Sequence, residues 1–157
     1  PGEYTMSTLA HWQTLIGIWT GTSRLFLPGE PTRESDTTAS VAIIAQGKFC
    51  TISYAWSFDA EPQAGMMLFG YDPDQPAVNA VFIDSWHMGH KLMLLQGSGE
   101  AQDTIDVRGS YAVESGPDWG WRMVIEPSDN TWRMLMYNVT PEGKEFLGVE
   151  AIYARTT

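Results

Sequence analysis

The sequence predicts an all-β protein, a ten-stranded antiparallel up-and-down β-barrel in which a short N-terminal helix closes one end. Ten segments rich in β-branched and aromatic residues follow one another at regular spacing, each bounded by turn residues. No second segment has the length of the helix that a parallel crossover needs. Residues 15–22 lead from the helix into the first strand, and residues 150–155 form the last. Pairing these two strands would remove the exposed edges of the sheet. A β-sandwich of similar length is the alternative fold.

A short helix is expected near the N-terminus, over residues 8–16. Ser7 is suited to cap its first turn, and apolar residues recur at helical spacing along one face. Gly17 follows and is expected to end the helix. Because a helix this short is marginal by itself, we expect it to pack across the closed end of the barrel, beside Trp19.

The strands are predicted from runs of β-branched and aromatic residues that lie between clusters of Pro, Gly, Asp and Asn. Residues 28–31 (Pro-Gly-Glu-Pro) separate the first two strands, and a tight turn at residues 46–48 (Gln-Gly-Lys) joins the second to the third. A longer loop is expected over residues 97–103. The ten predicted strands span residues 18–27, 34–45, 49–58, 64–71, 77–86, 91–96, 104–113, 119–126, 131–139 and 145–155.

The length of 157 residues corresponds to one domain, and a hydrophobic content of 43% is enough for a packed core. Residues 1–5 precede Met6 and are interpreted as a vector remnant or a disordered segment, so that the barrel domain spans residues 6–157. The N-terminus has no basic region followed by an apolar run, so no signal peptide is expected. A cytoplasmic location is the default expectation.

The formal net charge of −10, with a pI near 4.5, bounds the classes of partner. Proteins that bind nucleic acid need a basic surface, and anionic membranes attract basic segments. No stretch reaches the 18 or so apolar residues of a membrane-spanning helix. Neither nucleic acid nor membrane is therefore an expected partner, and the acidity is interpreted as a source of solubility and self-repulsion.

The motif Gly17-x-Trp19, followed by a C-terminal strand that ends in Arg155, resembles the hallmark of the calycins, the lipocalins and fatty-acid-binding proteins. The wider pattern is most similar to an uncharacterised bacterial lipocalin-like family. The resemblance implies that Trp19 lies at the closed end of the barrel and that Arg155 packs across its face. A cation over an indole contributes about 0.5–2 kcal/mol, depending on burial.

One end of the predicted barrel collects aromatic residues. In an up-and-down barrel, alternate turns lie at alternate ends. The turns opposite the helix are then residues 28–33, 59–63, 87–90, 114–118 and 140–144. Aromatic side chains flank these turns, and an aromatic concavity with a few polar groups is typical of a small-molecule site. We expect a ligand to enter between residues 87–90 and 114–118, over Trp86 and Trp121.

The candidate ligand-binding residues are the aromatic, histidine and methionine side chains of the inner strand faces and the rim. Methionine adapts to irregular apolar shapes and recurs on promiscuous binding surfaces. Because side chains alternate along a strand, some of these residues are expected to point outward or to fill the core. The candidates are Tyr54, Trp56, Trp86, His90, Trp121, Met123, Met134 and Met136.

Two carboxylates, Asp84 and Glu150, occur in strands that are otherwise mostly apolar. A carboxylate inside a barrel must be hydrogen-bonded or paired, or else become neutral. Inward-facing carboxylates would be candidate ligand anchors or candidate catalytic acids and bases. The alternative is that both side chains point outward into solvent.

Metal, haem and nucleophilic chemistry find little support in the sequence. His87 and His90 lie on a turn, with Asp84 nearby, but no further histidine is close in sequence. The related haem-binding nitrobindins use a histidine late in the chain, and no histidine follows His90 here. Cys50 is the single cysteine and has no local histidine. We therefore expect no metal and no cofactor.

These observations favour a non-enzymatic protein that binds a small apolar or amphipathic molecule inside the barrel. A second hypothesis is a metal-independent lyase, isomerase or cyclase that uses Asp84 or Glu150. A third is a homodimeric interaction protein whose barrel is filled by its own side chains. The strand at residues 64–71 is apolar on both faces, which indicates a covered outer surface and hence a homodimer.

Overall fold

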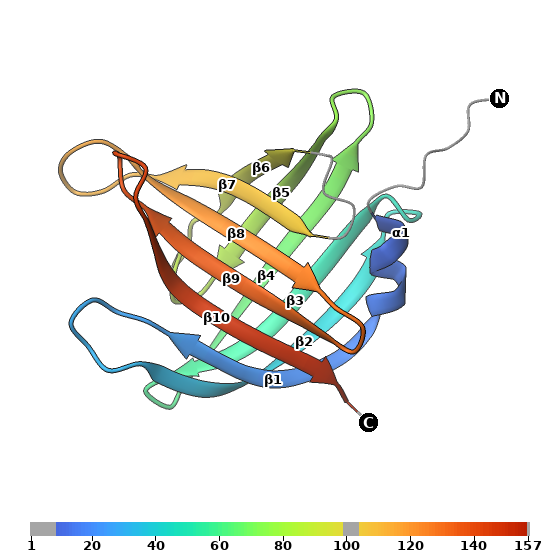
Figure 1. Cartoon of the computed structure of the whole chain (residues 1–157), viewed down its shortest axis with the longest axis horizontal. Coiled ribbons are helices and arrows are strands. Elements are labelled where there is room, and N and C mark those ends of the chain that lie inside the picture. The colour runs from blue at the N-terminus through green and yellow to red at the C-terminus, as the bar shows by residue number, and fades with distance from the viewer. Residues whose placement is uncertain (1–8, 99–103, 157) are drawn as a thin grey trace.

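Ten antiparallel strands form a closed ring in the computed structural model, which describes residues 9–98 and 104–156. Each strand pairs with its neighbours in sequence, and β1 pairs with β10 to close the ring (Figure 1). The predicted up-and-down barrel is therefore confirmed, and the sandwich is excluded. The strands are β1 (Gly17–Leu25), β2 (Arg33–Ile44), β3 (Phe49–Phe58), β4 (Glu61–Asp72), β5 (Ala77–Asp84), β6 (Met93–Ser98), β7 (Ile105–Tyr111), β8 (Trp119–Pro127), β9 (Thr131–Val139) and β10 (Glu145–Arg155).

The N-terminal helix is less regular than expected. One α-helical turn, α1 (Leu9–Trp12), tightens into a 3-10 turn, η1 (Gln13–Leu15). The change fits a helix terminus, where a tighter turn satisfies backbone groups that lack an α-helical partner. The expected cap at Ser7 lies outside the described residues, as does the segment at residues 1–5. The helix lies at one end of the barrel, as expected (Figure 1).

The connection between β3 and β4 is shorter than the predicted turn at residues 59–63. Asp59 and Ala60 both have positive φ angles, 46° and 69°, and Phe58 pairs directly with Glu61. Two central residues with positive φ are typical of the tight hairpin turns whose twist matches the flanking strands. β4 therefore begins three residues earlier than residue 64, the predicted start.

The interior of the barrel is packed with side chains from alternate strand positions. In β3, for example, Cys50, Ile52 and Tyr54 are buried, whereas the residues between them are more exposed. The closed end is filled by α1 and by the fully buried Trp12 and Trp132. The β1–β2, β7–β8 and β9–β10 connections lie at the opposite end, here called the mouth (Figure 1). No helix among the described residues is long and apolar enough to span a bilayer.

Candidate functional site

A buried carboxylate, Asp84 at the end of β5, organises the mouth of the barrel. Its Oδ2 accepts hydrogen bonds from the Tyr54 hydroxyl at 2.6 Å and from Trp56 Nε1 at 3.2 Å. Its Oδ1 accepts bonds from the backbone N–H groups of Trp86 at 2.8 Å and His87 at 2.9 Å. The side chain is 2% exposed, so these four donors satisfy a carboxylate that is cut off from bulk water.

Tyr54 reaches Asp84 by crossing the intervening strand. Tyr54, Gly65 and Asp84 occupy one row across β3, β4 and β5. A Cβ atom at residue 65 would lie 2.3 Å from the Tyr54 hydroxyl, so only glycine leaves room for the phenol. Burial, and then the negative charge of Asp84, raise the pKa of Tyr54 well above its ordinary value. The phenol therefore stays protonated and donates.

The two backbone bonds to Asp84 direct the β5–β6 turn back over the barrel. This places His87 among three indole rings. The imidazole stacks on Trp56 at 5.7 Å between ring centroids and forms a T-shaped contact with Trp86 at 4.8 Å. It also lies 5.4 Å from the ring of Trp121. Burial lowers the pKa of His87 from its ordinary 6.5, while the nearby Asp84 opposes that shift.

A pocket of about 690 Å³ lies at the mouth, between the β5–β6 turn and the ends of β1, β7, β8, β9 and β10. Its volume is within the range of small-molecule sites. We call it the mouth pocket. Its apolar lining includes Leu25, Leu27, Trp86, Met88 and Trp121.

Polar groups line one side of the mouth pocket. The Tyr111 hydroxyl donates to Asn138 Oδ1 at 2.6 Å, and Lys91 lies at the rim. Gly148 also lines the pocket, at a register shift in β10 between Leu147 and Val149. Such bulges are common at barrel rims, where they change the direction of a strand.

Below the mouth pocket, the described residues of the barrel interior enclose a small cavity of about 10 Å³. That volume is at the lower limit for a single water molecule. His87 and Leu25 line both cavities and so separate them. The described interior is thus nearly filled at this depth, and a space of molecular size lies above it at the mouth.

The predicted ligand-binding residues are distributed over both cavities. Tyr54, Trp56, Met134 and Met136 line the inner cavity, and Trp86 and Trp121 line the mouth pocket. Met123 is fully buried in the core and lines neither cavity. His90 is exposed on the turn and also lines neither, whereas the ring of His87 lines both cavities.

The two candidate catalytic carboxylates lie on opposite sides of the barrel wall. Glu150 faces outward, since its neighbours Val149 and Ala151 line the inner cavity. It pairs with Arg24 at 3.4 Å and Arg133 at 3.7 Å on the outer surface. Of the two alternatives that the sequence left open, Glu150 therefore takes the outward one. Asp84 does face inward, with both oxygens engaged by the protein's own donors.

Several residues of the two cavities were not among the sequence candidates. His87 was considered only as a metal ligand and as part of the turn beside the ligand entrance, and Lys91, Asn138 and Gly148 were not considered. Residues 114–118, which were expected to flank the ligand entrance, do not line the mouth pocket. The end of β7 and Trp121 form its wall on that side. In the sequence, the glycine at position 65 was the available signal for the contact between Tyr54 and Asp84, since a glycine inside a strand often marks a close approach by another group.

The described residues contain no group of three or more His, Cys, Asp or Glu side chains arranged to hold a metal ion. His87 lies inside the mouth and His90 is exposed, so the two imidazoles do not converge. Burial raises the pKa of Cys50 to about 12, which keeps this thiol protonated and unreactive at neutral pH.

The closed end carries the contact implied by the calycin resemblance. Trp19 pairs with Arg155 across β1 and β10, and the guanidinium carbon lies 4.4 Å from the centroid of the indole. Arg155 also donates to the backbone oxygens of Ile16, at 3.0 Å, and Thr14, at 2.5 Å. Gly17, with φ of +136°, admits this arrangement, because a Cβ there would lie 3.1 Å from the guanidinium.

Protonation of His87 is expected to weaken the fold in mild acid. Its pKa is lowered in the folded state, so the unfolded chain binds the proton more readily below pH 6.5. Stability then falls as the pH drops below 6.5, by at most about 1.4 kcal/mol per pH unit. Urea unfolding of the wild type and of His87→Gln at pH 7.5, 6.5 and 5.5 measures this. Parallel pH profiles for the two proteins would contradict it.

The fold and the site define a small closed β-barrel with a pocket at the end opposite its helix. The chain belongs to the family described as "Protein of unknown function (DUF1579)", whose model matches residues 7–155. No curated protein matches the sequence at a significant level.

Two solved structures share the fold. The crystal structure of Rv2717c from M. tuberculosis matches with a TM-score of 0.68 and 14% identity over 96% of this chain and 98% of that one. The S-type phycobiliprotein lyase CPES from Guillardia theta matches with a TM-score of 0.57 and 9% identity over 98% of this chain and 94% of that one. At these identities the likeness concerns the fold alone.

Proposed function

We propose that this protein binds a small apolar or amphipathic molecule in the mouth pocket. The observation that carries the proposal is the pocket itself, about 690 Å³ in volume and lined by Trp86, Trp121, Met88 and three leucines. An aromatic and aliphatic lining with a few polar groups is what small-molecule sites generally have. The polar side at Tyr111 and Asn138 suits the polar end of an amphipathic ligand.

The resemblance to calycins supports the same function, since lipocalins hold one small ligand in a barrel of comparable size. The likeness to a phycobiliprotein lyase supports a role for the barrel in ligand handling but does not carry over a lyase activity. The cavity inside the barrel, below the aromatic end where the sequence predicted the ligand, has room for about one water molecule, with a volume of about 10 Å³. This supports the mouth, rather than the interior, as the proposed position of the ligand.

We favour binding over the alternative function, which is catalysis that uses a carboxylate in the cavity. Asp84 holds the β5–β6 turn with two hydrogen bonds and accepts two more from Tyr54 and Trp56. In this arrangement its role is to position Trp86 and His87 in the wall of the pocket. No described feature favours a second function.

Replacing Trp121 by alanine is expected to weaken binding of the apolar probe ANS by at least tenfold, because the indole forms the inner wall of the mouth pocket. Fluorescence titration measures the dissociation constant. Phe146→Ala is the matched control, since Phe146 is 46% exposed, lies near the same end and does not line the pocket. Equal weakening in both variants, or new binding that appears only in Trp121→Ala, would contradict the proposed site.

A further inference from the structure

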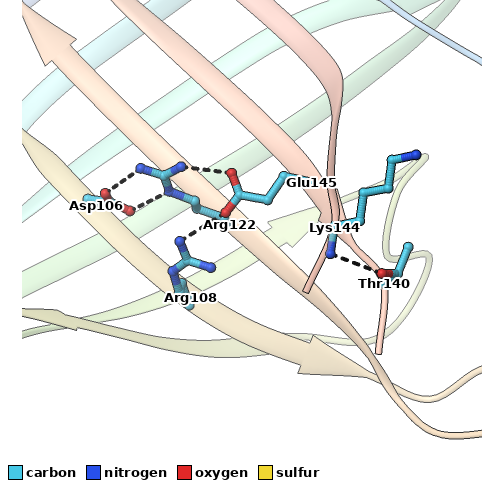
Figure 2. A network of polar contacts seen from close by, with 6 residues as sticks. All are labelled: Asp106, Arg108, Arg122, Thr140, Lys144 and Glu145. Atoms are coloured by element: carbon cyan, nitrogen blue, oxygen red, sulfur yellow. Dashed lines mark hydrogen bonds and ion pairs between the residues drawn. The ribbon is translucent and has the colours of Figure 1, made fainter. Parts of the chain in front are cut away.

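The outer surface of the barrel is divided by charge. Figure 2 shows one ion-pair network, in which Arg122 lies between Asp106 and Glu145 and Arg108 also binds Glu145. A second network, around Arg24, Glu150 and their neighbours, spans β1, β2, β8, β9 and β10. Among the ion pairs of residues 9–98 and 104–156, none involves β4, β5 or β6.

Neighbouring outward positions of β4, β5 and β6 carry large apolar side chains instead, beside the hydrogen-bonded polar pair Asn79 and Gln96. Leu68, Val81 and Leu94 form one row across the three strands, and Met66 pairs with Ile83 in the next row. Leu94 is 71% exposed. These five side chains and Phe49 of β3 are together called the apolar face, which thus consists of Phe49, Met66, Leu68, Val81, Ile83 and Leu94.

The apolar face contains both a projection and a hollow. Leu94 projects from β6 and borders a depression of about 400 Å³ over β4, β5 and β6, with Phe49 and Leu68 also in its lining. The lining also contains the polar side chains of Asn79, Gln96 and Arg108. A face that carries its own projection and hollow is able to pack on a copy of itself about a two-fold axis. Each Leu94 would then fill the hollow of the other chain.

The charge distribution of the molecule is compatible with a second copy as the occupant. Two chains with a net charge of −10 each repel one another. The six side chains of the apolar face are uncharged, and the charged side chain that lines the hollow, Arg108, is paired with Glu145 at 2.9 Å. Two copies that meet on this face therefore bring few like charges together. Soluble monomers rarely leave contiguous apolar patches of more than a few hundred Å² open to water. We propose that the apolar face is the interface of a homodimer in which β4, β5 and β6 of the two chains pack face to face.

Two isoleucines provide a matched test of the interface. Ile83 on β5 is 39% exposed and belongs to the apolar face, whereas Ile152 on β10 is 40% exposed and lies on the charged side. A lysine at either position changes the net charge by the same amount. Only Ile83→Lys would bury an unpaired ammonium group in the proposed interface, and that is strongly unfavourable.

Sedimentation velocity from about 5 to 300 μM measures the mass of each protein. The wild type and Ile152→Lys are expected to sediment with twice the chain mass of 17.5 kDa, and Ile83→Lys with the mass of one chain. Circular dichroism establishes that each variant is folded. If Ile83→Lys does not fold, Leu94→Lys, at a position 71% exposed, takes its place. A wild type that stays monomeric throughout, or a lysine variant of the apolar face that stays dimeric, would overturn the proposal.

Discussion

Replacing Trp19 by alanine is expected to lower the free energy of unfolding by about 3–5 kcal/mol, the usual cost of truncating a large buried aromatic. The indole is 1% exposed and packs between Arg155, at 4.4 Å, and the edge of Trp132, at 6.1 Å between centroids. Its Nε1 donates to the backbone oxygen of Leu15 at 2.9 Å, which ties the helical segment to the barrel. Urea unfolding followed by circular dichroism measures the change.

Phe146→Ala is the control for the loss of Trp19. Phe146 is also an aromatic residue on a strand, but it is 46% exposed and contacts Lys144 in solvent. We expect this variant to lose less than about 1 kcal/mol. If Trp19→Ala loses no more than Phe146→Ala, the closed end of the barrel does not depend on the Trp19 contact.

The second large effect is expected at Asp84. Asp84→Ala leaves two backbone N–H groups, the Tyr54 hydroxyl and the Trp56 indole without their acceptor. An unsatisfied buried donor costs roughly 1–3 kcal/mol. Because water entering the vacated space restores part of this, we expect a loss of about 3–5 kcal/mol in urea unfolding, together with loss of ANS binding at the mouth.

Asp84→Asn separates the contributions of the two oxygens. The amide oxygen continues to accept from the turn, but the amide nitrogen then faces the donor of Trp56. We expect a smaller loss, about 1–3 kcal/mol. Asp36→Ala, on the exposed face of β2, is the control and is expected to change stability by less than about 0.5 kcal/mol. An Asp84→Ala protein as stable as this control would show that the turn does not depend on the carboxylate.

The fold was predictable because each strand carries its own evidence. Alternating or apolar runs between turn residues identified all ten strands, and eight of their starts lie within one residue of residues 18, 34, 49, 77, 104, 119, 131 and 145. Chain topology then placed the turns at alternate ends. The Trp19–Arg155 contact followed from the resemblance and from the pairing of the first and last strands.

The site was less predictable because it depends on contacts between distant strands. The side of the wall that Glu150 faces follows from the register of β10, which includes a bulge at Gly148 that interrupts simple alternation. The choice between His87 and His90 depends on the path of a turn, and that path depends on two hydrogen bonds to Asp84. Alternation along strands contains no information on either point.

The mouth pocket is tested most directly by the indole N–H signals of the seven tryptophans in a two-dimensional ¹H–¹⁵N spectrum. Titration with ANS is expected to shift the signals of Trp86 and Trp121, which line the pocket, in a saturable manner. The signals of Trp12 and Trp132, at the closed end, are expected to stay in place. Shifts confined to Trp12 and Trp132, or no shift at saturating ANS, would contradict the proposed site.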